Sequence, residues 1–176
     1  NIDAIAGYGY YDNKRTEHFY PTTQFDGTVL STPAFPYNIP QNRLLSYYGR
    51  LIYTYDNKYI LSGTIRTDGS SKFSPDDNKN FGFFPSAAFT WRISEEPMLK
   101  NNNVLSDLKL RLSYGVTGQQ DVNNNYGYLP NYALSANESQ YQFGDNFFQM
   151  YAPVAYDADL RWESTETYNI GLDYGF

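Results

Sequence analysis

The sequence of 176 residues contains no cysteine, which excludes disulfide bonds and thiolate metal sites. It contains no run of about 20 apolar residues, so no helix is expected to cross a membrane. Positive charge is scarce and scattered, because 13 basic residues stand against 19 acidic ones and no Lys/Arg cluster occurs. A protein that binds a phosphate backbone needs such a cluster, so nucleic acid is excluded as a partner.

Histidine occurs once, at His18 in a proline-rich stretch, so a Ser/His/Asp triad would depend on a single loop residue. The short acidic runs at residues 76–77 and 157–159 lack the spacing of a calcium-binding loop. We therefore predict that the chain is not an enzyme and that it holds neither a metal nor a cofactor.

Aromatic residues, by contrast, are abundant, with 19 tyrosines and 12 phenylalanines. In DLKLRLSYGVT, from Asp107 to Thr117, apolar and polar residues alternate. A repeat of two collects apolar side chains on one side of a strand, whereas a helix would scatter them. Six segments show this repeat, at residues 2–10, 45–55, 59–68, 81–93, 107–117 and 167–176. The sequence thus predicts an all-β, antiparallel fold.

The connections between these segments alternate in length. Residues 56–58 make a tight turn and residues 94–106 a medium one, whereas residues 12–43, 69–80 and 118–164 form long polar loops. Short turns at one end and long loops at the other are typical of outer-membrane β-barrels. We predict a transmembrane barrel segment of about six strands, with the three long loops outside the cell. A soluble antiparallel sandwich also alternates, and it is the alternative fold.

The barrel interpretation gives each face of the strands its own surroundings. The residues predicted to face lipid are Leu61, Ile65, Phe89, Leu108, Leu110, Leu112, Ile170 and Leu172. Those predicted to face the lumen are Arg50, Arg66, Arg92, Lys109, Arg111 and Asp173. We expect the cations to pair with Asp3, Asp68 and Asp173, or with acids of a plug domain, because unpaired buried charges are unfavourable.

Two local features refine the barrel prediction. Tyr59 and Trp91 lie near the periplasmic ends of their segments, where amphipathic rings are expected at the level of lipid headgroups. Pro85 lacks the N–H that a paired strand needs, so it should mark a bulge or an unpaired strand end.

Four motifs follow one another along residues 44–176: DGSS from Asp68, GFFPSAAFTWRIS from Gly82, LKLRLSYGVTG from Leu108 and WESTETYNIGLD from Trp162. In this order they resemble the barrel of SusC/RagA-type TonB-linked outer-membrane receptors of Bacteroidota. Residues 1–43 fit the family only loosely, as a strand and a variable loop.

The resemblance implies a barrel of about 22 strands in the bacterial outer membrane, closed by a plug domain that is not in this chain. It implies uptake of oligosaccharides or peptides, energised by the TonB system through the plug. It also implies a SusD-like lipoprotein as a lid over the bound glycan or peptide. Because six strands cannot close even a barrel of about eight, we interpret the chain as a piece of a larger wall.

The loop of residues 118–164 is the predicted binding region. Aromatic rings stack on the C–H faces of sugars and amides bond their hydroxyls, so this mixture suits carbohydrate or a lid protein. Packing of the rings within the loop is the alternative. The predicted substrate-binding residues are Asn123, Asn125, Tyr126, Tyr128, Tyr132, Tyr141, Phe147 and Trp162. The alternative function is a soluble or surface-displayed β-sheet adhesin or carbohydrate-binding protein that uses the same loop.

Overall fold

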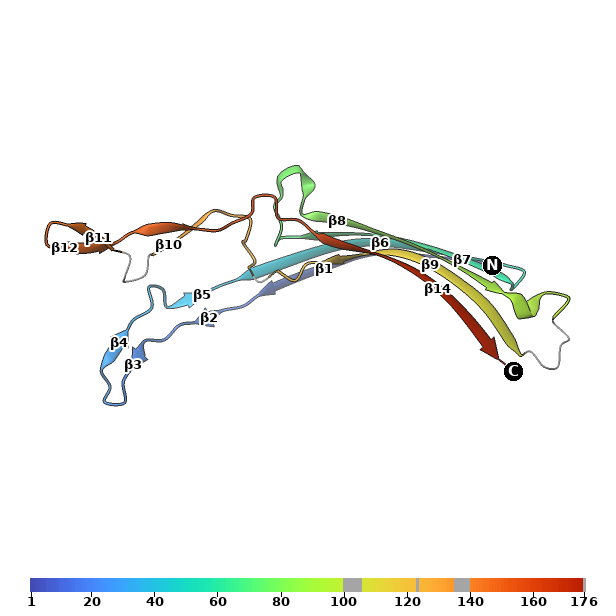
Figure 1. Ribbon diagram of the computed structural model, residues 1–176, viewed down its shortest axis with the longest axis horizontal. Helices are drawn as coiled ribbons and strands as arrows, with labels where there is room; N and C mark the ends of the chain where they lie inside the picture. The colour runs from blue at the N-terminus through green and yellow to red at the C-terminus, as the bar shows by residue number, and fades with distance from the viewer. Residues whose placement is uncertain (100–105, 123, 135–139, 176) are drawn as a thin grey trace.

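Six long antiparallel strands form one curved sheet, in which each strand lies beside its neighbour in the chain order β1-β6-β7-β8-β9-β14 (Figure 1). The computed structural model describes residues 1–99, 106–122, 124–134 and 140–175. The strands are β1 (Ile2–Lys14), β6 (Gln41–Tyr55), β7 (Tyr59–Ser70), β8 (Phe81–Arg92), β9 (Asp107–Gln119) and β14 (Glu163–Gly175). The predicted all-β, antiparallel fold is confirmed.

The register of the strands collects like residues on one face. Leu61 pairs with Phe89, Phe89 with Leu112, and Leu112 with Ile170. Because paired residues project to the same side and side chains alternate along a strand, all eight residues predicted to face lipid share this side, the apolar face. All six residues predicted to face the lumen share the other side, the polar face. The medium that each face meets stays a prediction.

The two ends of the sheet differ. Both chain termini and the turn after Tyr55 lie at one end, the turn end, and the long loops leave from the other, the loop end (Figure 1). Asp56 and Asn57 have left-handed backbone, with φ of 48° and 53°. The N–H of Lys58 donates to the carbonyl oxygen of Tyr55 at 3.0 Å. Such a turn matches the twist of the strands that it joins.

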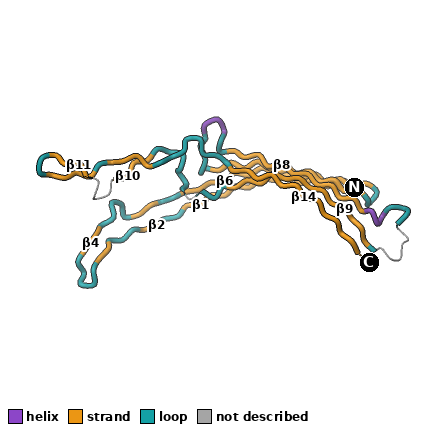
Figure 2. Tube along the Cα trace, viewed as in Figure 1, coloured by secondary structure: helices purple, strands orange, loops and turns teal. Residues whose placement is uncertain are grey.

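Two of the three predicted long loops, those after β1 and β9, extend beyond the sheet as arms that contain short strands (Figure 2). The first arm, residues 15–40, pairs β2 (Glu17–His18) with β5 (Tyr37–Asn38) and β3 (Thr22–Thr23) with β4 (Val29–Ser31). The second arm, residues 131–154, pairs β10 (Asn131–Leu134) with β13 (Tyr151–Val154) and β11 (Gln140–Phe143) with β12 (Asn146–Gln149). The sequence analysis did not predict these strands, because two to four residues are too few to show a repeat.

The sheet strands also differ from the predicted segments in extent. At the loop end β6 begins at Gln41 rather than at residue 45, and β14 at Glu163 rather than at residue 167. At the turn end β8 stops at Arg92, one residue before the end of the predicted segment. Ile93 begins a short 3₁₀ turn, η2 (Ile93–Glu95), and a second such turn, η1 (Asp76–Asn78), lies between β7 and β8.

The sheet is a wall one layer thick. Among the described residues, Phe73 and Phe84 are the buried apolar side chains, at 1% and 8% exposure, whereas Ile170 on the apolar face is 81% exposed. No second sheet of described residues covers the apolar face, so the alternative sandwich is not formed. No helix within the described ranges is long and apolar enough to span a membrane.

Candidate functional site at the loop end of the sheet

The sheet splits at its loop end between β8 and β9. β8 pairs with β7 as far as Phe81, but it pairs with β9 only as far as Ser86. The pairing stops next to Pro85, which cannot donate to a ladder. The prediction that Pro85 marks an unpaired strand end is therefore confirmed on the side of β9.

Three aromatic residues, Phe73, Phe84 and Trp162, pack together at this split and form an aromatic clamp. The ring centroid of Trp162 lies 5.1 Å from that of Phe73 and 5.2 Å from that of Phe84. The indole Nε1–H of Trp162 donates to the carbonyl oxygen of Asn80 at 2.9 Å. The clamp thus joins the segment before β14 to the loop between β7 and β8.

Backbone carbonyl groups add polar ties to this clamp. The Lys72 ammonium lies 3.5 Å and 3.4 Å from the carbonyl oxygens of Gln120 and Val122. The N–H of Ser74 donates to the carbonyl oxygen of Leu160 at 3.1 Å. Residues 71–80 therefore hold both ends of the loop that carries the second arm, near Gln120 and near Leu160.

An ion pair closes the outer side of the same junction. The Lys79 Nζ lies 2.5 Å from the Asp159 Oδ1. The hydrogen bond between the two groups raises the pKa of Lys79 above its ordinary 10.5 and lowers the pKa of Asp159 below its ordinary 3.8. Because Asp159 is exposed, the pair adds little stability on its own and is sensitive to salt.

On the polar face, two of the expected charge pairs are present. The Arg66 Nε donates to both carboxylate oxygens of Asp68, at 2.7 Å and 3.0 Å, and its Nη2 lies 3.4 Å from the Ser46 hydroxyl. The Arg111 Nη2 lies 2.7 Å from the Asp173 Oδ1 on the neighbouring strand. Pairing with Asp68 and Asp173, as predicted from the sequence, is confirmed.

The other cations of the polar face differ from this expectation. Lys109 pairs with Asp107 at 2.7 Å, two residues away on its own strand. Arg92 donates to a carbonyl oxygen of the tight turn at 3.5 Å. Arg50 has no ionic partner in the part of the chain that the structure describes, and Asp3 pairs with no described cation. The expectation that Asp3 neutralises this face is wrong for the described residues, because Asp3 accepts a hydrogen bond from Asn1.

Two of the predicted substrate-binding residues line a polar pocket. Asn125 and Tyr126 meet Asn13 of β1 and Asn38 of the first arm around a pocket of about 360 Å³, the rim pocket. The N–H of Gln41 donates to the Tyr126 hydroxyl oxygen at 3.3 Å, which joins this loop to the start of β6. The rim pocket is rich in amides, as a site for hydroxylated or peptide ligands requires.

The other described members of the predicted substrate-binding set do not line the rim pocket. Tyr132, Tyr141 and Phe147 are exposed on the second arm, which projects from the sheet (Figure 1). Trp162 belongs to the clamp, Tyr128 is half-buried in the loop, and Asn123 lies outside the described residues. The structure thus distributes the predicted set over the rim pocket, the arm and the clamp.

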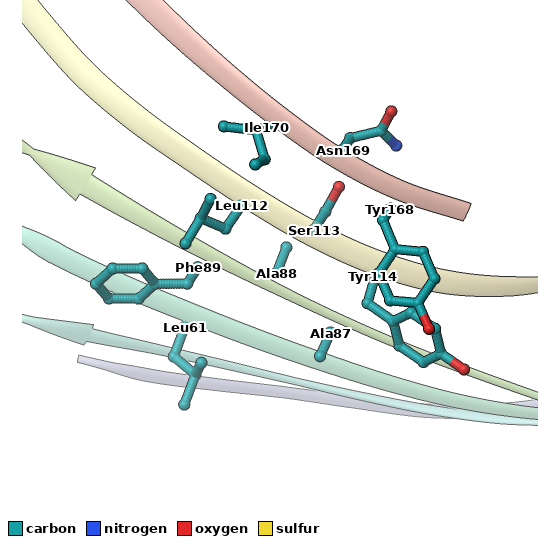
Figure 3. Close-up of a pocket in the computed structure, with 10 residues that line it drawn as sticks. All are labelled: Leu61, Ala87, Ala88, Phe89, Leu112, Ser113, Tyr114, Tyr168, Asn169 and Ile170. Carbon is teal, nitrogen blue, oxygen red and sulfur yellow. The ribbon is translucent and has the colours of Figure 1, made fainter. Parts of the chain in front are cut away.

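The apolar face carries a shallow hollow of about 380 Å³ (Figure 3). It lies where Ala87 leaves room beside Phe89 and Leu112, and the rings of Tyr114 and Tyr168, 4.9 Å apart, border it. Its lining offers few polar groups, so it suits hydrocarbon rather than a polar ligand.

Glu96 accepts two side-chain hydrogen bonds that the sequence analysis did not predict. The hydroxyl of Tyr59 and the indole N–H of Trp91 both donate to its Oε1, at 2.8 Å and 3.1 Å. These hydrogen bonds, with that of Tyr59 the larger, lower the pKa of Glu96, and Lys58 acts in the same direction. The carboxylate thereby holds two rings together at the turn end, where they were predicted to meet headgroups. Only its place shortly after Trp91 hinted at this role.

The described residues contain no group of three or more His, Asp or Glu side chains that could hold a metal ion. His18 contacts the rings of Tyr20 and Tyr37 on the first arm. The amides of the rim pocket and the exposed aromatic side chains of the arms suit recognition of a ligand or a partner.

Comparisons with known proteins agree with this geometry. The family model for the β-barrel of TonB dependent receptor-like proteins matches residues 1–176. The TonB-dependent receptor SusC of Bacteroides thetaiotaomicron is 49% identical over 136 residues, which are 77% of this chain and 13% of SusC. A TonB-dependent receptor of Formosa agariphila is 32% identical over 188 residues, covering 98% of this chain and 18% of that receptor.

Solved structures show the same fold. The structure of the RagAB peptide transporter superposes with a TM-score of 0.74 at 23% identity, covering 99% of this chain and 19% of the matched chain. The chain thus spans less than a fifth of the length of these relatives. The family resemblance of the four motifs is confirmed. The chain belongs to the β-barrel family of TonB-dependent receptors, which are proteins of the bacterial outer membrane.

Proposed function

We propose that this chain forms part of the wall of an outer-membrane importer, driven by the TonB system, that takes up oligosaccharides or peptides. The observation that carries the proposal is the two-faced sheet of a TonB-dependent receptor family member, with apolar side chains on one face and paired charges on the other. Such a wall suits lipid on one side and a polar lumen on the other. The role is binding and passage of a ligand, without chemistry on it.

The loop end and the polar face of the sheet each suit one partner protein. The arms expose many aromatic side chains at the loop end, which suits contact with a SusD-like lipoprotein lid that closes over the ligand. Cations of the polar face that lack an acid partner, such as Arg50, suit contact with a plug domain that relays the TonB signal. One solved relative is a peptide transporter, which supports import as the activity.

Uptake measurements test the proposal. The intact receptor containing this chain is expressed in cells with and without TonB, which are supplied with fluorescent neutral oligosaccharides or a fluorescent casein digest. We expect one ligand pool to accumulate in the periplasm only when TonB is present. Equal accumulation without TonB would contradict energised import, and failure to bind either pool would contradict the proposal as a whole.

A further inference from the structure

A second pocket lies on the polar face at the loop end, apart from the rim pocket. Its volume is about 520 Å³, and Arg66, Phe84, Thr117, Gln120 and Trp162 are among the residues that line it. These residues come from β7, β8, β9, the start of the loop after β9 and the segment before β14, so the pocket sits beside the split in the sheet. We call it the wall pocket.

Gln120 gives the wall pocket an unused acceptor. Its side-chain Oε1 is buried and accepts no hydrogen bond from any described residue. The backbone carbonyl oxygen of Gln120 accepts a hydrogen bond from the Lys72 ammonium at 3.5 Å, which ties the backbone at this position to the loop between β7 and β8. A buried acceptor without a donor is unfavourable. Since Gln120 borders the pocket, rotation of its terminal amide brings this oxygen to a donor on a ligand.

Arg66 supplies donors without supplying net charge. Its Nε is bound to Asp68 and its Nη2 to Ser46, while no described residue bonds its Nη1. The guanidinium is half exposed and the carboxylate of Asp68 is buried, so the positive charge is compensated inside the wall. An anionic ligand would gain little here, whereas a neutral ligand with hydroxyl groups can accept from Nη1.

The clamp supplies a fixed aromatic surface. The indole of Trp162 packs against the rings of Phe73 and Phe84, and its N–H is already bonded to Asn80, so its orientation is set before a ligand arrives. A rigid ring favours stacking with the C–H face of a sugar, because little side-chain entropy is lost on binding. This assigns a binding role to Trp162 that is compatible with its packing.

We infer that the wall pocket is a subsite for one neutral sugar ring. The ring stacks on the clamp, one of its hydroxyl groups donates a hydrogen bond to Gln120 Oε1, and another accepts a hydrogen bond from Arg66 Nη1. The inference rests on the proposed import function and narrows its ligand to neutral oligosaccharide. Charged peptide termini do not match a pocket whose one ion pair is already neutral.

Calorimetry on the purified intact receptor tests the subsite. The probes are neutral glucan, mannan, xylan and fructan oligosaccharides, with a casein digest as the peptide probe. Gln120→Leu removes the acceptor at nearly constant size, and Gln24→Leu in the turn between β3 and β4 is the matched control. Gln120→Leu removes an unpaired buried oxygen, so it should fold at least as stably as the wild type.

We expect one oligosaccharide to bind the wild type and to bind Gln120→Leu about tenfold more weakly. Gln24→Leu should bind it like the wild type. Unchanged affinity in Gln120→Leu, or binding of peptides alone, would overturn the subsite. TonB-dependent uptake measured in parallel separates the two proposals: uptake that persists unchanged in Gln120→Leu refutes only the subsite, whereas absence of any uptake refutes the import function.

Discussion

Gly118 leaves the space in which the Phe84 ring of the clamp lies. A Cβ atom at Gly118 would overlap three atoms of this ring, whereas a Cβ at Gly63 in β7 would meet nothing within 4 Å. Gly118→Ala should therefore cost about 1–3 kcal/mol of the free energy of unfolding, and Gly63→Ala should be nearly neutral. Denaturant unfolding of the intact receptor in detergent measures both. Equal stability of the two variants would show that the clamp relaxes freely.

Ile170 tests which medium the apolar face meets. It lies near the middle of β14, is 81% exposed and pairs with Leu112. If lipid surrounds it, Ile170→Arg should cost about 2–4 kcal/mol of folding free energy in liposomes. The adjacent Asn169→Arg, which points to the polar face, should cost much less. Similar losses of folding free energy in both variants would contradict the assignment of the apolar face to lipid.

At the scale of elements, the ion pair between Lys79 and Asp159 links two loops in a pH-dependent way. The lowered pKa of Asp159 means that its contribution is full above 3.8 and is lost as the pH falls through the folded-state value. The raised pKa of Lys79 means that its contribution is full below 10.5 and is lost as the pH rises through its folded-state value. Between these limits the contribution should be constant.

Hydrogen exchange of residues 71–80 measures this link. The wild type should exchange more slowly than Asp159→Asn at neutral pH, and the difference should shrink as the pH falls below 3.8 towards the lowered folded-state pKa of Asp159, and also in about 1 M salt. Comparison at equal pH removes the intrinsic exchange rate, and Asp26→Asn in the first arm serves as control. A difference that persists at low pH would assign the protection to the clamp alone.

The loop between β9 and β14 should determine ligand preference. It contains the rim-pocket residues Asn125 and Tyr126 and the second arm. A chimera in which residues 121–161 are replaced by the same loop of a relative with a different ligand should acquire the ligand preference of that relative. Replacement of residues 94–106 at the turn end should leave the preference unchanged. Uptake of both ligands by each chimera provides the readout. Unchanged preference in the first chimera would take this loop out of the binding site.

The strands of the sheet were predictable because apolar and polar residues alternate along each of them. Alternation over ten or so residues fixed the two faces, and Asp56 and Asn57 favour the left-handed turn between β6 and β7. The clamp was not predictable, because it joins Phe73, Phe84 and Trp162 across long sequence separations. Only the break at Pro85 carried a local signal for it. The arm strands are too short for any repeat to appear.

At the scale of the whole molecule, the sheet has two open edges. β1 pairs only with β6, and β14 only with β9, so each leaves one row of backbone groups without a partner among the described residues. Long unpaired edges are unfavourable in water and still more so in hydrocarbon, where no solvent can satisfy an N–H. A receptor in a bilayer must therefore continue the wall beyond both strands.

Hydrogen exchange of the intact receptor tests this continuation. If further strands pair with both edges, peptides from β1 and β14 should exchange as slowly as peptides from β7, which is paired on both sides. The first arm, residues 15–40, should exchange much faster, because its strands are short and its residues are exposed. Fast exchange at alternate amides of β1 or β14 would mean that the edge stays open. Since an open edge cannot persist in hydrocarbon, that result would also contradict the assignment of lipid to the apolar face.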